Sequence, residues 1–247
     1  MIADARLITA RRAFEFGPDE LRLTVLSIPQ VREAIARIFA FQTAQVATPM
    51  PTFAPPMITV PPGLVFEIGV LNLPDSSPMP IRFLHIDGRR IVVDVAGPTS
   101  GAVAVFNALK ETLANTRSPD GGPAIGQFKR TQDYSEISVK FGFSPDSLLA
   151  PGLRDLFNRM FSSPPGLDTP AGIVVPSLRF GIVSPTDDYV GSPQGNDQSR
   201  YAIDLRLGSL PSDNNYYSSA PLDTESHLKY LADLGTTLGS PATVESD

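Results

Sequence analysis

The chain has 247 residues, 42% of them hydrophobic, and it contains no cysteine, no tryptophan and only two histidines. A chain of this length can bury most of its unfolded surface without disulfides or a structural metal, as a globular protein does. The absence of cysteine excludes disulfide bonds, thiolate zinc sites, iron–sulfur ligation and a cysteine nucleophile. We therefore expect a folded protein without a cofactor and without a metal site.

The charge is divided unevenly along the chain. The net charge is −6, and all of it lies in residues 121–247, which carry 9 basic and 15 acidic side chains. Because lysine and arginine do not cluster, the sequence argues against binding to nucleic acid. No uncharged apolar stretch approaches the roughly 18 residues of a membrane span, and the charged first residues do not resemble a signal peptide. A cytoplasmic protein with no membrane partner is expected.

Two segments predict a strand that leads into an amphipathic helix. Residues 20–29 align without gaps with residues 136–145. Apolar and polar residues alternate in both, as in a half-buried strand, with the apolar positions at Leu21, Leu23 and Val25 and at Ile137, Val139 and Phe141. Apolar residues at helical spacing follow in residues 31–39 and 153–161. The order strand, then helix, is thus predicted twice.

Further strands are predicted after each helix. Residues 64–68 and 178–182 alternate as strands do, and residues 81–95 form a hairpin pattern in which Asp87-Gly88 provides the tight turn. The last strand of that hairpin, residues 90–95, resembles residues 200–205. This alignment places Asp94 and Asp204 at equivalent positions of two internal copies, one in each half of the chain. Whether the first copy has one strand more than the second is left open.

A helix closes each copy. It begins at Thr99 in the first copy and at Thr224 in the second, and in both an apolar stripe follows at i, i+3 and i+4 spacing. The stripes consist of Val103, Phe106, Leu109 and Leu113 and of Leu228, Leu231, Leu234 and Leu238. Each threonine is predicted to cap the free amides of its own first helical turn.

The predicted fold class is α+β, with an internal duplication. Each copy is a strand-helix-strand-strand-helix unit with a mostly antiparallel sheet and helices packed on one face. The expected domains are residues 1–115, a Gly/Pro-rich linker at 116–126, a second repeat at 127–240, and a flexible tail at 241–247.

The two histidines give little indication of catalysis. His227 lies in the first turn of the last helix beside Asp223 and Glu225, and it is expected to be a surface residue. A catalytic serine–histidine–aspartate set would need partners that converge in space, which local neighbours do not provide. His85 is expected to be partly buried and hydrogen-bonded. No phosphate-binding loop and no H-E-x-x-H pattern occurs.

Asp94 and Asp204 are the candidate ligand-binding residues, because each interrupts an apolar strand. One interpretation is an exposed strand face or an ion pair with an arginine of the next strand, such as Arg82 or Arg179. The other is a pair of carboxylates across a groove between the copies, available for acid–base work or for a cationic ligand. The sequence does not choose between them.

Two polar segments of the second copy, residues 184–199 and 208–223, are predicted to be long loops. Tyrosines lie in them among serine, asparagine and aspartate, a composition typical of adaptable binding surfaces. The candidate partner-binding residues are Asp187, Asp188, Tyr189, Tyr216 and Tyr217.

These patterns favour a non-enzymatic protein-binding or assembly protein that contacts a protein partner or a second copy of itself. The alternative is a sensor that binds a small molecule in the groove between the repeats, near Asp94 and Asp204. A hydrolase that uses carboxylates or His227 is the third and least supported hypothesis, because catalytic motifs are missing.

Overall fold

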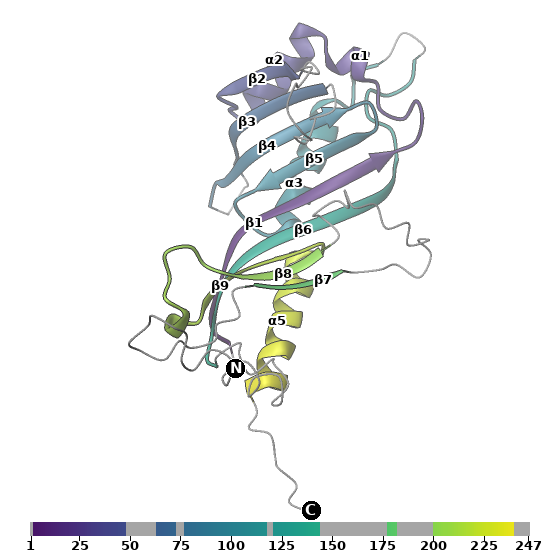
Figure 1. Cartoon of the computed structure of the whole chain (residues 1–247). Coiled ribbons are helices and arrows are strands. Elements are labelled where there is room, and N and C mark those ends of the chain that lie inside the picture. Colours follow the sequence, from purple (N-terminus) through teal and green to yellow (C-terminus); the bar gives the residue numbers. More distant parts are fainter. Residues whose placement is uncertain are drawn as a thin grey trace, which may run out of the picture. The chain divides into compact units, whose positions relative to one another are not determined.

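The protein is described from a computed structural model that covers residues 2–47, 63–72, 77–117, 121–143, 177–181 and 200–239 (Figure 1). These residues form one antiparallel sheet of nine strands with four short helices, in the strand order β2-β3-β4-β5-β1-β6-β9-β8-β7. About 47% of the structure is strand and 28% is helix. The predicted fold class is therefore wrong: the protein is mostly sheet, and it does not form a clear pair of α+β repeats.

The chain forms two compact units. Unit 1 comprises Met1–Arg6, Glu136–Pro221 and Glu225–Asp247, and unit 2 comprises Leu7–Ser135 and Leu222–Thr224. Two long strands, β1 (Ile2–Phe16) and β6 (Phe128–Phe141), contribute residues to both.

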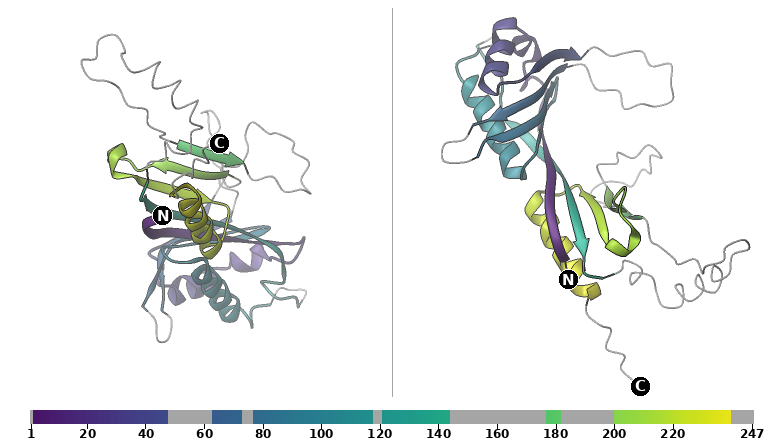
Figure 2. Two further views of the ribbon diagram at one scale, coloured as in Figure 1. Left: turned by 90° about the horizontal axis from the view of Figure 1, so that it is seen from below. Right: turned by 90° about the vertical axis from the view of Figure 1, so that its left-hand side faces the viewer.

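Unit 2 holds most of the described helices. Its other elements are α1 (Leu23–Leu26), α2 (Pro29–Ile38), β2 (Thr43–Ala47), β3 (Gly63–Leu71), β4 (Met79–Asp87), β5 (Arg90–Val95) and α3 (Thr99–Thr112). All three helices cover the same face of the strands (Figure 2, right). The core between them contains Phe14, Phe66, Leu84, Ile86, Ile91 and Val93 from the strands and Leu26, Ile35, Val105, Phe106 and Leu109 from the helices.

The first strand lies where the sequence did not predict one. Residues 20–29 contain α1, so the expected alignment of this segment with residues 136–145 pairs a helix with strand β6 and is wrong. The true first strand is β1, whose period is hidden by charged residues such as Arg11 and Arg12. Both arginines form ion pairs with aspartates of neighbouring strands, and this pairing lets charged residues occupy a central strand.

The middle of unit 2 agrees with the prediction. The strands expected at 64–68 and 81–95 are β3, β4 and β5, and the helices expected at 31–39 and from Thr99 are α2 and α3. The turn between β4 and β5 differs in detail, because Gly88 does not have a positive φ. Instead, the Asp87 carboxylate accepts hydrogen bonds at 2.7 Å from the amides of Arg89 and Arg90.

Unit 1 contains β7 (Ser177–Gly181), β8 (Arg200–Leu205), a short 3₁₀ helix η3 (Pro211–Asp213), β9 (Asn215–Ala220) and all but the first residue of α5 (Thr224–Gly239). Strand β9 was not predicted, since its sequence N-Y-Y-S-S-A reads as a loop. The predicted helix from Thr224 is α5, with Leu231 buried as expected. Leu228, predicted to face the core, is exposed, and His227 is buried instead.

The other expected segments have mixed outcomes. Ala124 and Ile125, from the stretch expected to be a linker, are buried in the core of unit 2. The helix expected at 153–161 and the tail at 241–247 lie outside the described residues. No helix in the described part of the chain has the length and apolar character to cross a membrane.

Candidate functional site

Asp94 of β5 is the centre of a buried polar cluster in unit 2. Its carboxylate accepts hydrogen bonds from Thr9 Oγ1 at 2.7 Å and from Nε and Nη2 of Arg11 at 3.0 and 2.9 Å. Arg82 of β4 lies farther away, with its Nε 3.8 Å from the carboxylate. The ion pair with Arg82, one of the two interpretations of the sequence, is therefore present. Arg11 and Thr9 also bond the same carboxylate, at shorter distances.

Aromatic rings hold the Arg11 side chain in place. Its guanidinium carbon lies 5.0 Å from the ring centre of Phe83 and 5.6 Å from that of Tyr134, within the range of cation–π attraction. Only 1% of the Asp94 side chain is exposed. The Asp94 carboxylate of β5 is thus used for hydrogen bonds to Thr9 and Arg11 of the neighbouring strand β1.

Asp204 of β8 has a different environment, within unit 1. It accepts a hydrogen bond from Ser177 Oγ and lies 3.6 Å from Nη2 of Arg179, both on the adjacent strand β7. This is the other ion pair that the sequence suggested. The Asp204 side chain is 33% exposed, and its partner in the β8–β9 register is Tyr217. The two aspartates therefore differ in burial and in the position of their strands in the sheet.

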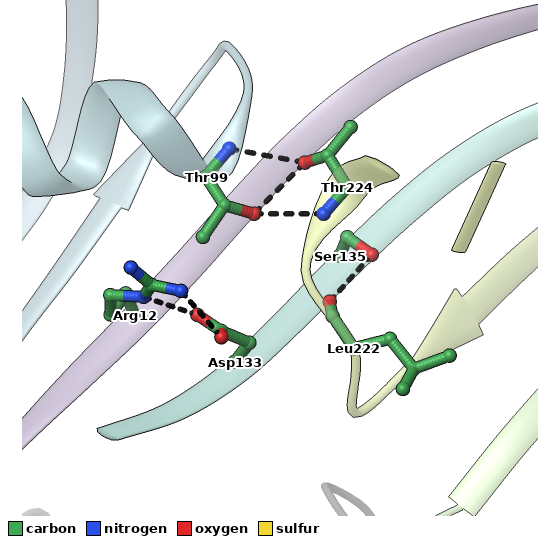
Figure 3. Close-up of polar contacts among 6 residues, drawn as sticks. All are labelled: Arg12, Thr99, Asp133, Ser135, Leu222 and Thr224. Atoms are coloured by element: carbon green, nitrogen blue, oxygen red, sulfur yellow. Dashed lines mark hydrogen bonds and ion pairs between the residues drawn. The ribbon is translucent and has the colours of Figure 1, made fainter. Parts of the chain in front are cut away.

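Within unit 2, residues 222–224 are bonded to side chains of α3 and β6 (Figure 3). The amide of Thr99 donates to Thr224 Oγ1 at 3.1 Å, the amide of Thr224 donates to Thr99 Oγ1 at 3.0 Å, and the two hydroxyls lie 3.0 Å apart. Both threonines are buried. The prediction that each caps its own helix is wrong for Thr99, whose hydroxyl caps the amide of Thr224 instead.

Two further contacts lie nearby, of which the first involves Leu222. Ser135 Oγ of β6 donates to the Leu222 carbonyl at 2.9 Å. Nearby, Nε and Nη2 of Arg12 donate to the two carboxylate oxygens of Asp133 at 2.5 and 2.7 Å (Figure 3). The hydrogen bond to Asp133 and the charges of Asp133 and Asp223 raise the pKa of Arg12 against the opposing effect of burial. The Ser135 hydrogen bond thus holds Leu222 to β6, whereas the Arg12–Asp133 pair joins β1 to β6.

His227 is buried in unit 1, contrary to the prediction of a surface residue. Its Nε2 lies 2.9 Å from Ser218 Oγ of β9, and its ring packs edge-on against Tyr201 of β8 with centres 5.5 Å apart. Burial lowers the pKa of His227 to about 4. The local sequence does not indicate this burial, because only the fold brings Ser218 and Tyr201 to His227.

The Ser218–His227 contact has the distance of a nucleophile and its general base. However, both side chains are fully buried, and Ser218 Oγ also donates to the Ala202 carbonyl at 3.2 Å. A base with a pKa of about 4 is poorly matched to proton transfer at neutral pH. This pair is therefore better explained as an anchor between α5 and the β8–β9 hairpin.

No protein-family profile and no curated protein sequence matches this chain. Among the described residues, no group of three or more histidine, aspartate or glutamate side chains is placed to hold a metal ion.

The predicted partner-binding residues are dispersed. Asp187, Asp188 and Tyr189 lie outside the described residues. Tyr216 is buried, with its ring centre 5.7 Å from that of Phe141, because residues 215–220 form strand β9 rather than a loop. Tyr217 is half-buried on β9.

The turn between β8 and β9, residues 206–213, has the most exposed apolar side chains described. Leu207 is 99% exposed and Leu210 is 66% exposed. Local hydrogen bonds fix the backbone around them: Ser209 N to Arg206 O at 3.0 Å, Asp213 N to Leu210 O at 2.9 Å, and Leu210 N to the Asp213 carboxylate at 3.1 Å. Sequence reasoning placed part of this turn in the contact loop 208–223 but did not select the leucines.

Proposed function

We propose that this protein is a non-enzymatic protein-binding protein and that the β8–β9 turn, residues 206–213, is its contact surface. The observation that supports this proposal is the exposure of Leu207 and Leu210 on a turn with a fixed backbone. We place the protein in the cytoplasm as part of the same proposal, because of the charge and hydropathy pattern of the sequence.

A single exposed leucine on a protein surface is ordinary. The turn differs because the Asp213 carboxylate and the two backbone hydrogen bonds hold both leucines outward, at the end of a hairpin. Burying one leucine side chain in a partner is worth about 1.5–3 kcal/mol, and an ordered turn loses little conformational entropy on binding. The partner that fits is a protein with an apolar pocket that admits two leucines.

The polar contacts elsewhere in the described structure agree with a binding role. The carboxylates of Asp94 and Asp133, the Arg11 and Arg12 guanidiniums and the Ser218 hydroxyl are all bonded within the fold. Chemistry on a substrate needs such groups directed toward a site that substrate can reach. A turn that docks onto a partner needs only a shape complementary to the partner's pocket and an exposed apolar surface.

The test is site-specific photo-cross-linking in cells of the protein's own source. A benzophenone amino acid replaces Leu207 in one variant and Ile68, a 57% exposed residue of unit 2, in the control. We expect an adduct of one defined mass at position 207 that excess wild-type protein competes away, and no such adduct at position 68. Equal adducts at both positions, or none at 207, would contradict the proposal.

A second measurement separates a protein partner from self-association. The adduct mass identifies a second copy of this chain or a different protein. The double variant Leu207→Ser with Leu210→Ser should retain the wild-type circular dichroism spectrum and lose at least about 90% of the adduct formed from a neighbouring position, Ser209. An unchanged adduct yield in this variant would show that the leucines are not the contact.

A further inference from the structure

Met79, the first residue of β4, places its sulfur on the first turn of α3, and we propose that this methionine is a site of reversible oxidation. The sulfoxide does not fit against that turn, so oxidation weakens the start of α3. This inference does not depend on the proposed function, because Met79 and α3 lie in unit 2, whereas the β8–β9 turn lies in unit 1.

Two glycines leave the space that the Met79 sulfur fills. A Cβ atom at position 101 would lie 2.1 Å from Sδ of Met79 and 2.7 Å from its Cε, and a Cβ atom at position 97 would lie 3.3 Å from Sδ. Carbon and sulfur atoms that are not bonded to each other do not approach to 2.1 Å, so any side chain at position 101 would displace the sulfur. The thioether of Met79 therefore packs directly on the backbone of Gly101.

Backbone conformation does not explain the glycine at position 101. Its φ is not positive, so other residues adopt this conformation without strain. Glycine also disfavours helix formation, and Gly101 lies in the first turn of α3 (Thr99–Thr112). The feature that requires a glycine here is the close approach of the methionine sulfur.

The sulfur lies where the core of unit 2 meets solvent. Gly101 and Val95 are both buried, and Cγ2 of Val95 lies 3.7 Å from the position of a Cβ atom at residue 101. Met79 packs against this core but is only half-buried, and its neighbours Pro78 and Pro80 are exposed. A small oxidant in solvent can therefore reach a side chain whose sulfur contacts the core.

The chemistry is the oxidation of a thioether by hydrogen peroxide. The chain contains no cysteine, so methionine is the sulfur group that peroxide can oxidise. The sulfur attacks one peroxide oxygen, the S–O bond forms and the O–O bond breaks. The proton of the attacked oxygen passes to the departing hydroxide, which leaves as water, and two electrons pass from sulfur to peroxide. A methionine sulfoxide reductase reverses the change: two thiols become a disulfide and the oxygen leaves as water.

Oxidation adds a polar oxygen to an atom that packs on a helix backbone. If the sulfoxide stays in place, its oxygen is buried beside Gly101 and Val95, where the contacts are apolar. If the side chain turns out to solvent, it leaves a void beside the same two residues. Both arrangements remove packing from the first turn of α3.

The first turn of α3 also holds Thr224. Thr99 lies two residues before Gly101 and exchanges hydrogen bonds of 3.1 and 3.0 Å with Thr224, which belongs to unit 2 as well. The amide of Gly101 donates to the Pro98 carbonyl at 2.8 Å, so Gly101 and Thr99 are part of one bonded turn. Loss of the Met79 contact should therefore weaken the hydrogen bonds between the two threonines.

The test is treatment of the native full chain with hydrogen peroxide, with peptide mapping by mass spectrometry to follow each methionine. We expect oxidation of Met79 to lower the midpoint of thermal unfolding by roughly 3–8 °C. Exchange of the Thr99 and Thr224 amides, measured by NMR, should become roughly 5- to 20-fold faster, and that of the α2 amides less than about twofold faster.

Reversal is part of the same experiment. Reductases for both sulfoxide epimers, supplied with dithiothreitol, should restore the midpoint and the exchange rates. Dithiothreitol alone should change neither, because the chain has no disulfide to reduce. A Met79 that reacts with peroxide only after the protein unfolds, or a sulfoxide that leaves both the midpoint and the exchange rates unchanged, would overturn the proposal.

Met79→Leu is the matched control. Leucine fills a similar volume and is not oxidised by peroxide, and the variant keeps four of the five methionines. Peroxide should lower the unfolding midpoint of this variant by less than about 1 °C. A fall as large as that of the wild type would assign the effect to another methionine and would overturn the proposal.

A second variant tests the contact without oxidation. Gly101→Ala places a methyl group where the Met79 sulfur lies, whereas helix propensity alone would make alanine the more stable residue. We expect the unfolding midpoint to fall by at least about 3 °C, because the sulfur has to move. A rise in the midpoint would show that the sulfur does not occupy this space, and the proposal would fail.

Discussion

At the scale of single residues, burial decides what the two aspartates contribute. Asp94 is bonded to Thr9 and Arg11 and is 1% exposed, whereas Asp204 is 33% exposed and paired with Ser177 and Arg179. Removing one partner of a buried pair leaves a charge without compensation in a site of low polarity. A pair near solvent is screened and contributes little.

We therefore expect unequal effects from the same substitution. Asp94→Asn should lower the free energy of unfolding by about 2–4 kcal/mol, because the Arg11 guanidinium loses its charged acceptor. Asp204→Asn, the matched control, should lower it by less than about 1 kcal/mol. Urea denaturation followed by circular dichroism measures both. Equal effects would mean that burial does not govern the two pairs.

Ile68 has a backbone conformation that is unfavourable for its residue type. Its φ is 54°, in the left-handed region, and a β-branched residue is strained there. The side chain is 57% exposed, so packing does little to offset the strain. Glycine adopts this conformation without a steric penalty.

Replacing this residue by glycine should stabilise the protein. Ile68→Gly relieves about 1–2 kcal/mol of backbone strain and adds a smaller entropic cost, for a net gain of about 0.5–1 kcal/mol. The control is Ile8→Gly, at an exposed position of β1 without a positive φ, which should cost about 1 kcal/mol. Thermal unfolding of both variants gives the comparison, and a loss of stability in Ile68→Gly would contradict the argument.

At the scale of elements, the first residues of α3 and α5 depend on each other. Thr99 and Thr224 exchange hydrogen bonds between hydroxyl and amide in both directions. Neither amide has its acceptor within its own helix, because these are the first-turn donors that a helix leaves unpaired. Each helix start is thus completed by a residue 125 positions away.

A double-mutant cycle should show this dependence. Thr99→Val leaves the buried amide of Thr224 without an acceptor and should cost about 1–3 kcal/mol, as should Thr224→Val. The double variant should cost about 0.5–1.5 kcal/mol less than the sum, since the hydroxyl–hydroxyl contact is lost only once. Thr112→Val, which removes a hydroxyl bonded within α3, is the control and should change stability by less than about 0.5 kcal/mol. Strict additivity of the two buried substitutions would show that they act independently.

At the scale of the whole molecule, local periodicity was a reliable guide only to some elements. The helices α2, α3 and α5 and the strands β3 to β5 follow from apolar spacing, because each has one face in the core. Strand β1 was missed since its arginines are compensated by aspartates far away in sequence. Strand β9 was missed because serine and asparagine occupy its positions. The incorrect fold class followed from these two omissions and from reading α1 as a strand.

The candidate sites show the same limit. Ion pairs of Asp94 and Asp204 with arginines of adjacent strands were one of the two interpretations of the sequence, since a carboxylate in a strand needs a partner. The burial of His227 was not expected, because only the fold brings Ser218 and Tyr201 to it. The exposure of Leu207 could not be predicted either, because the sequence of a turn does not show whether a leucine in it packs against the fold or faces solvent. Long-range contacts decide these cases.

The position of β1 also has a consequence for synthesis. This strand leaves the ribosome before β5, whose partner residues follow 75 to 85 residues later. At roughly 5–20 residues per second, β1 waits on the order of 4–17 seconds before it can pair. During this interval the nascent chain exposes the apolar residues Ala10, Phe14 and Phe16 beside unpaired backbone groups. The sheet of unit 2 can therefore assemble around β1 only after β5 has been synthesised.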